Sequence, residues 1–334
     1  LYGVWDHLKN VGNHGVENYD LEWIGMVPGY RESRRLEGNY ILTENDIRAN
    51  TRFDDAVAYG AWPMDVHVRG GLRDLKEYPS HVFNFEGCYT IPYGCYCSKN
   101  IENLMMAGRD ISASKMAFSS VRVMGTCAIG GQAVGTAAAM AIQKGCTPRE
   151  VGERYIRQLQ QTLLKNDCYI PGIRNTDPHD LARTATVTAS SETDAGLASN
   201  VINGISRSEG TEKNYWESGE LKDGGESIQL DLKCPETIHQ LRLTFDTNLS
   251  GEIMPSLTRI VRDRQVKGLP HELVRDYKVT LYRDGREAWN CGVCDNGQRL
   301  NVLEVPGVEA DRLEITVTAT YGLERARIYE VRIY

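Results

Sequence analysis

The 334-residue sequence has no long apolar run, no excess of basic residues, no internal repeat and no low-complexity tract. None of its apolar stretches approaches the roughly 20 residues that a membrane-spanning helix needs. Lys and Arg number 38 against 45 Asp and Glu, so the formal net charge is −7. That balance argues against a broad nucleic-acid-binding surface. We therefore expect neither membrane insertion nor a nucleic-acid partner.

The start of the chain lacks a methionine and a signal-like pattern. Leu1 is followed by neither a basic segment nor an apolar one of the kind that directs export. We interpret the chain as part of a longer protein, and this end of it therefore leaves the compartment open.

The nine cysteines lack a regular spacing. Cys291 and Cys294 form one C-x-x-C, but no second pair stands at zinc-ribbon distance. Cys95 and Cys97 lie two apart, which suits alternate positions of an extended segment better than a metal site. We expect free, mostly buried thiols and no metal site, with a zinc or disulfide role as the less favoured alternative.

Residues 147–166 carry the clearest helical pattern. Thr147 and Glu150 match a capping box, and Pro148 suits the first helical position. The turn-rich stretch 170–180 follows and predicts a domain boundary. We expect an oxidoreductase-like part over 1–172, a linker over 173–180 and a second domain over 181–334.

The second domain shows short runs of alternating polar and apolar residues and no strong helical pattern. An Asp284-Gly285 pair predicts a tight hairpin turn. This pattern predicts an antiparallel jelly-roll sandwich. The expected strands cover 185–190, 227–232, 238–246, 276–285, 300–305, 313–321 and 326–334.

The first part mixes both periodicities, as an α/β fold does. Residues 103–109 (NLMMAGR) predict a buried strand, and a glycine-rich helix follows that we expect Thr126 to cap and Gly145 to end. Two explanations of its glycines stay open. A neighbouring element packs closely on the helix, or the helix N-terminus faces an electron-rich ligand.

Three ordered motifs give this part its resemblance to a known family. They are GYRESRRLEGNYILTENDI (29–47), CYTIPYGCYCSKNIENLMMAGRD (88–110) and the run from AGRDIS to SSVRVMGTCAIGGQAVGTAAA (107–139). Over about residues 20–160 the sequence resembles bacterial FAD-dependent oxidoreductases of the branch related to fumarate reductase and aspartate oxidase. The resemblance implies a partial FAD-binding domain of α/β class.

The resemblance also implies site residues. Gly108, Arg109 and Asp110 would meet the ribityl chain and phosphates, although relatives often place an acidic residue directly after the glycine. Backbone N–H groups at the helix start would face the flavin pyrimidine carbonyl, and Arg122 would lie near the substrate. The implied helix-start residues are Thr126, Cys127 and Ala128.

The family's dinucleotide fingerprint is absent, since no G-x-G-x-x-G follows a strand in this chain. The chain therefore resembles the C-terminal portion of such an enzyme. We expect FAD in the full-length protein, and we expect this fragment alone to be inactive without the N-terminal half.

Two further groups of polar residues allow either a structural or a catalytic interpretation. The arginines of RESRR, among them Arg34, either form local ion pairs on a solvated turn or hold an anionic or carbonyl-bearing substrate. Asp65 and His67 lie on one side of an extended segment, as a structural pair or as a general base with its orienting partner. Cys127, if exposed at a helix N-terminus, is expected to have a lowered thiol pKa.

Residues 181–334 resemble discoidin-type, galactose-binding-like domains. The motifs are ATVTASSE, the Asn203-Gly204 turn with Trp216 after it, and the closing IYEVRIY. The resemblance implies glycan binding by loop aromatics, so Trp216 is either a sugar platform or a core residue. It also favours an extracytoplasmic location.

These observations predict a flavin-dependent oxidoreductase fragment joined to an accessory sandwich. The chemistry would be hydride transfer between flavin and a small-molecule or sugar-related substrate, with Arg122 and Arg34 holding substrate and His67 moving a proton. The alternative is a non-enzymatic carbohydrate-binding module on a scaffold without redox activity.

Overall fold

A computed structural model describes residues 1–27, 34–74, 76–251, 253, 256 and 258–334. The chain divides into two compact units, Leu1–Arg34 and Arg35–Tyr334. In the first unit, α1 (Tyr2–Asp6) runs directly into a π-helix, η1 (His7–Val11). No residue of either helix is buried, and neither buried core includes a described residue of this unit.

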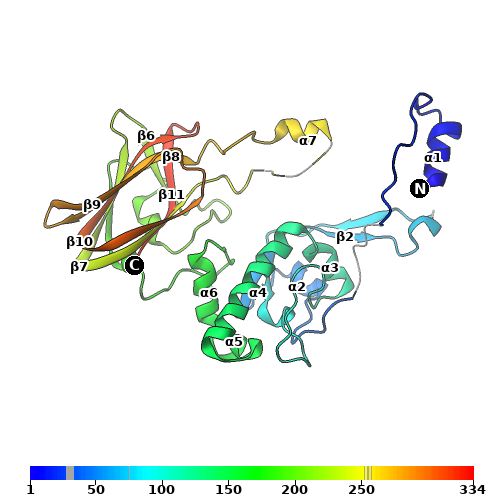
Figure 1. Cartoon of the computed structure of the whole chain (residues 1–334), viewed down its shortest axis with the longest axis horizontal. Coiled ribbons are helices and arrows are strands. Elements are labelled where there is room, and N and C mark those ends of the chain that lie inside the picture. Colours follow the sequence, from blue (N-terminus) through cyan, green and yellow to red (C-terminus); the bar gives the residue numbers. More distant parts are fainter. Residues whose placement is uncertain (28–33, 75, 252, 254–255, 257) are drawn as a thin grey trace. The chain divides into compact units, whose positions relative to one another are not determined.

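The first part of the larger unit is built on a core of buried residues between 42 and 170. Two small antiparallel sheets, β1–β4 and β2–β3, lie beside several helices (Figure 1). The strands are β1 (Ala56–Gly60), β2 (Met64–His67), β3 (Ser80–Phe83) and β4 (Tyr89–Pro92), and the helices include α2 (Glu44–Arg48) and α3 (Lys115–Val121).

The strand expected over 103–109 is not formed. That segment makes only an isolated bridge between Met105 and Cys97, antiparallel and outside any sheet. A strand needs a partner along its length to satisfy its backbone groups, and no described strand pairs with this one. The prediction of a buried strand here is wrong for this structure.

The glycine-rich helix is α4 (Met124–Lys144), and Gly145 ends it in the left-handed conformation, as expected. Its start is two residues earlier than predicted, because Val123 rather than Thr126 is the N-cap. By length and composition alone α4 could cross a membrane, a criterion that core helices also meet, and a third of its most apolar window is buried.

Only one interior glycine of α4 is held close to a neighbour. A Cβ on Gly130 would lie 2.6 Å from the Tyr96 hydroxyl oxygen. Tyr96 is buried, so its ring has no room to move. The other glycines, Gly125, Gly131 and Gly135, have nothing within 4 Å of such a Cβ. The close-packing explanation therefore holds for Gly130 and leaves one side of the helix open.

The predicted helix over 147–166 is present with one interruption. The capping box of Thr147 and Glu150 forms as expected. Tyr155 leaves the α-helical region and divides the segment into α5 (Pro148–Arg154) and α6 (Ile156–Lys165). The ring of Tyr155 lies beneath two cations, with Lys144 Nζ 4.5 Å from its centroid.

The rest of the unit is the expected antiparallel sandwich, in which two long strands run through both layers (Figure 1). One layer has the order β6–β11–β7–β10, and the other has β5–β7–β10–β8–β9. The strands are β5 (Thr186–Ala189), β6 (Trp216–Glu220), β7 (Glu226–Phe245), β8 (Val274–Arg283), β9 (Arg286–Val293), β10 (Leu300–Thr320) and β11 (Arg325–Ile333).

Four of the predicted strands are therefore halves of two. β7 joins the expected 227–232 and 238–246, and β10 joins 300–305 and 313–321. Pro235 in β7 and Pro306-Gly307 in β10 lie at breaks of the pairing register, where a residue without a ladder hydrogen bond is tolerated. In both strands the proline therefore marks a β-bulge within one strand and not a turn between two strands.

The hairpin between β8 and β9 forms as predicted. Asp284 and Gly285 both have positive φ, at 49° and 73°, and Arg283 pairs with Arg286 across the turn. A short helix, α7 (Arg259–Arg264), lies in the connection between β7 and β8.

The sandwich has its own core of buried residues between 182 and 333, separate from the core of residues 42–170. The segment between them is bonded to the sandwich. Asp180 accepts hydrogen bonds from the backbone N–H groups of Ala182 and Ile333. The domain limits given above stay a prediction.

The close-packed Gly130 and the open Gly131 of α4 predict opposite changes in stability when each is replaced by alanine. Gly130→Ala should lower the free energy of unfolding by about 1–3 kcal/mol, because the methyl overpacks against Tyr96. Gly131→Ala should raise it by up to about 1 kcal/mol, because it adds helix propensity without a clash. Urea unfolding of both variants measures this, and equal effects of the two would contradict the packing.

Candidate active site

A short joint between two helices positions the residues around the N-terminus of α4. Ser114 caps α3 by accepting a hydrogen bond from the Ala117 N–H at 3.2 Å. Arg122 is the C-cap of α3, and extended Val123 is the N-cap of α4. This places the Arg122 side chain directly before the first turn of the long helix.

The first turn of α4 leaves backbone donors unused. Val123 provides no side-chain cap, and the first N–H bonded within this turn is that of Cys127, which donates to the Val123 carbonyl at 3.0 Å. The unpaired donors therefore belong to Met124, Gly125 and Thr126. Of the three residues predicted to offer N–H groups, Thr126 belongs to this unpaired set. Cys127 and Ala128 lie further along the helix, where N–H groups bond within it.

The tip of the helix is open in the described structure. Met124 is 78% exposed, and no atom lies within 4 Å of a Cβ built on Gly125. The partial positive charge of a helix N-terminus therefore faces unoccupied space.

The segment Gly108–Asp110 lies near this tip. Gly108 has a φ of 107°, which only glycine adopts without strain, and it turns the chain before Arg109. The Asp110 Oδ1 atom is buried without a hydrogen-bond partner in the described structure. A buried carboxylate oxygen in that state is costly unless a donor reaches it.

The lowered pKa expected of an exposed Cys127 does not apply, because the side chain is half-buried. Burial raises the pKa of this thiol, Arg109 partly offsets the rise, and Asp110 adds to it. Desolvation outweighs the nearby cation because the thiol is half-buried within the helix. The opposite effects of Arg109 and Asp110 also indicate that both charges lie close to the helix start.

Arg122, Asp65 and His67 form a cluster, as three of the residues singled out from the sequence. Arg122 Nη2 donates to the Asp65 carbonyl at 2.9 Å and lies 3.4 Å from Asp65 Oδ2. His67 Nε2 lies 3.4 Å from the same Oδ2. Asp65 Oδ1 is buried and unpaired, so this carboxylate has bonding capacity left.

A buried tyrosine supports this cluster. The Tyr89 hydroxyl lies 2.6 Å from Ser120 Oγ, which donates to the carbonyl of Trp62. This links β4 and α3 to the segment that enters β2, and so fixes the positions of Arg122 and Asp65. Ser120 lies within the motif 107–139, but nothing in the sequence singled it out. Tyr93, in contrast, packs against Gly152 and donates to the Pro148 carbonyl at 2.8 Å.

The arginines of RESRR are not assembled into this site by the described contacts. Arg31 lies outside the described residues, and Arg34 is an exposed residue at the end of the smaller unit. Arg35 lies in the larger unit, with its guanidinium carbon 5.2 Å from the centroid of the Phe118 ring.

Trp216 is a core residue. It is fully buried, and its indole N–H donates to the Ser191 carbonyl at 2.9 Å. A buried ring cannot stack on a glycan, so of the two interpretations the structure supports the packing one.

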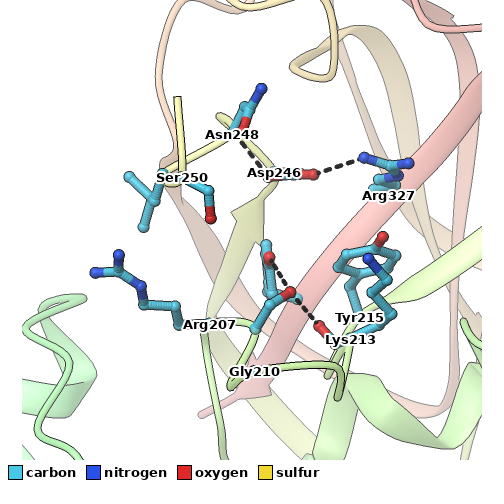
Figure 2. Close-up of a pocket in the computed structure, with 11 residues that line it drawn as sticks. Arg207, Gly210, Lys213, Tyr215, Asp246, Asn248, Ser250 and Arg327 are labelled. Atoms are coloured by element: carbon cyan, nitrogen blue, oxygen red, sulfur yellow. Dashed lines mark hydrogen bonds and ion pairs between the residues drawn. The ribbon is translucent and has the colours of Figure 1, made fainter. Parts of the chain in front are cut away.

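A polar cavity of about 200 Å³ lies at one end of the sandwich (Figure 2). Arg327 Nη1 donates to Asp246 Oδ2 at 3.2 Å, and its guanidinium carbon lies 4.9 Å from the centroid of the Tyr215 ring. Asn248 and Lys213 complete the polar wall. No sequence motif pointed to this cavity, because its residues come from separate loops and strands.

Residues 1–163 match the family described as FAD dependent oxidoreductase. No curated protein matches the chain in sequence.

Several solved structures that resemble about half of the chain are sugar-binding modules by their titles. A Streptococcus pneumoniae fucose binding module is 13% identical, with a TM-score of 0.36, and the match covers 46% of this chain and 96% of that one. The lectin domain of lectinolysin complexed with Lewis B antigen is 14% identical, with a TM-score of 0.35, and the match covers 48% and 98%. A family 32 CBM from C. perfringens NanJ in complex with galactose is 15% identical, with a TM-score of 0.33, and the match covers 46% and 97%.

The charges around Cys127 predict opposite changes in its reactivity. Arg109→Gln should raise the thiol pKa further and slow alkylation at neutral pH, whereas Asp110→Asn should lower the pKa and speed it. Iodoacetamide labelling against pH, followed at this cysteine by peptide mass spectrometry, measures both. Shifts of the same sign in the two variants would show that these side chains do not face the helix start.

Proposed function

Because residues 1–163 match the FAD dependent oxidoreductase family, we propose that they form the flavin-contacting part of such an enzyme. The observation that carries the proposal is the open N-terminus of α4, with three unpaired backbone donors beside the unpaired carboxylate oxygen of Asp110. A flavin presents carbonyl acceptors and a hydroxylated ribityl chain, and these groups match the two features.

The residues present fit one side of a flavin. The N–H groups of Met124–Thr126 would bind the pyrimidine carbonyl, and the helix dipole would stabilise negative charge on a reduced ring. Asp110 would accept hydrogen bonds from ribityl hydroxyls, and Gly108, which has no side chain, lets the backbone approach them. When bound, FAD would supply the acceptor or donor of hydride.

The cluster beside the tip is suited to hold and protonate a substrate. Arg122 lies at the helix joint with its guanidinium oriented by Asp65. Its remaining donors could bind a carbonyl or carboxylate oxygen of the substrate. His67 on the other side of Asp65 could take a proton from the substrate or give one to it.

The rest of the flavin site belongs, in this proposal, to an N-terminal half of the same protein. The chain contains no G-x-G-x-x-G, and one side of α4 is open at Gly125, Gly131 and Gly135. A dinucleotide-binding half packed on that side would hold the ADP portion of FAD. The 334 residues alone would then bind FAD weakly and lack activity.

The full-length protein should accordingly be yellow as purified, with a flavin absorption spectrum that bleaches on adding a chemical reductant. Asp110→Ala should lose most of the flavin, because the ribityl acceptor is gone, whereas Asp194→Ala in the sandwich should keep it. A colourless full-length protein after reconstitution with FAD would contradict the proposal.

Arg122→Ala should separate substrate binding from flavin binding. Anaerobic mixing with sugars and sugar acids identifies a compound that bleaches the wild-type flavin, and the variant should react about 100-fold more slowly with it. FAD content should stay near that of the wild type. Equal losses of rate and of FAD would remove Arg122 from the substrate side.

A second candidate function rests on the cavity of Figure 2, whose wall of Lys213, Asp246, Asn248 and Tyr215 offers donors and acceptors suited to sugar hydroxyls. In this case the chain is a carbohydrate-binding module on a scaffold without redox activity. Galactose should then bind the colourless protein, and Asn248→Ala should weaken binding. Galactose binding that Asn248→Ala leaves unchanged would exclude this cavity.

A further inference from the structure

A second cavity lies between the oxidoreductase-like part and the sandwich, both within the compact unit Arg35–Tyr334. Its volume is about 440 Å³, within the range of small-molecule sites. It is bounded by the end of β1, the loop before β4, the segment after α6 and the sandwich loop 207–210. The residues that carry the argument are Arg52, Tyr59, Cys88, Tyr169, Arg207 and Glu209.

The sandwich loop is held in place by contacts across this cavity wall. Arg207 Nη1 donates to the Tyr59 hydroxyl at 2.6 Å, and its guanidinium carbon lies within 6.0 Å of the ring centroids of Tyr59 and Tyr169. The Tyr169 hydroxyl donates to Glu209 Oε1. The charged groups are therefore oriented before any ligand arrives, which lowers the entropic cost of binding.

The same charged groups keep unused bonding capacity. Within the described structure, only the Nη1 atom of the Arg207 guanidinium donates a hydrogen bond to another protein group. Arg52 donates only to Cys88, with its Nη1 2.7 Å from the carbonyl oxygen and the sulfur farther away. Glu209 has one carboxylate oxygen that accepts no bond. Two cations and one anion face the cavity, so a ligand with both an anionic group and hydroxyl donors matches it.

The shape of the wall suits a ring. The rings of Tyr59 and Tyr169 stand edge to face at 5.5 Å and provide an apolar surface beside the charges. Gly172 and Gly210 have positive φ and nothing within 4 Å of a Cβ, so backbone lines the opening without side chains. An aromatic surface with polar groups at its rim is a common way to bind the C–H face of a sugar.

We infer that this cavity binds an anionic saccharide, with Arg52 and Arg207 on its carboxylate and Glu209 on its hydroxyls. The inference goes beyond the proposed flavin chemistry and requires neither flavin nor turnover. It gives the sandwich a direct part in ligand binding, because Arg207 and Glu209 come from its loop.

The loop 207–210 also borders the cavity of Figure 2, so the two cavities share Arg207, Ser208 and Gly210. In Figure 2 the guanidinium of Arg207 points away from Arg327 and Tyr215. Of the two cavities, Arg52 lines the one between the oxidoreductase-like part and the sandwich, and Lys213 lines the one in Figure 2, the sandwich cavity. These two residues therefore distinguish the sites.

Calorimetric titration of the intact 334-residue chain tests the inference, with D-galacturonate as the probe and D-galactose as its uncharged match. Galacturonate should bind at least about tenfold more tightly than galactose, because the carboxylate adds charge-assisted hydrogen bonds. Arg52→Gln and Arg207→Gln should each weaken galacturonate binding by about tenfold. Arg286→Gln, on the β8–β9 turn and in the lining of neither cavity, should leave it unchanged.

Each other outcome contradicts the inference. Absent galacturonate binding, or galactose binding of equal strength, would remove the anionic saccharide. Inorganic phosphate that binds as tightly as galacturonate, and competes with it, would show that the site binds anions in general and not a saccharide. Weakening by Lys213→Gln but not by Arg52→Gln would move binding to the sandwich cavity. Urea unfolding controls for folding, and Arg52→Gln carries the test if Arg207→Gln is unstable.

Discussion

The uncapped first turn of α4 is the constraint on which the account of this protein depends. The first N–H groups of a helix are satisfied by a side-chain acceptor, by water or by a ligand, and the N-cap Val123 has no side-chain acceptor. The surrounding chain is arranged around this end. Arg122 precedes it, Asp110 lies near it with an unpaired oxygen, and Gly125 leaves the approach open. Taken together, these features favour an acceptor-bearing ligand at the tip.

The second organising feature is the way in which the sandwich is joined to the preceding helix. Arg242 of β7 and Arg299, which directly precedes β10, bond the end of α6 and the segment after it. Arg242 Nε donates to the Lys165 carbonyl at 3.1 Å, and Arg299 Nε bonds Asp167 Oδ2 at 2.8 Å. Both members of the second pair are largely buried, at 12% and 17% exposure. Breaking one side of such a pair is costly. Arg299 also donates to the carbonyl of Ser206, directly before the loop 207–210.

Much of this fold could be predicted from the sequence where local chemistry decides the structure. The Thr147–Glu150 capping box, the Gly145 helix end and the Asp284-Gly285 turn each depend on a few adjacent residues, and each formed as expected. Errors occurred where distant residues decide. α4 starts earlier than predicted because the joint between α3 and α4 fixes the positions of Arg122 and Val123. Residues 103–109 do not form the predicted strand because no described strand pairs with them.

The candidate sites divide in the same way. Arg122 and the Asp65–His67 pair were singled out separately, and the fold brings them together where β2 lies beside the end of α3. The lowered pKa expected for an exposed Cys127 thiol did not apply, because its burial cannot be read from a helix position alone. Neither polar cavity could have been found, since Arg52, Tyr169 and Arg207 lie in three segments that no motif connects.

The most direct test of the central claim is a crystal structure of the full-length protein with FAD. The account predicts backbone nitrogens of Met124–Thr126 at about 2.7–3.2 Å from a carbonyl oxygen of the flavin ring. Protein side chains packed over that turn, with the flavin elsewhere or absent, would contradict it.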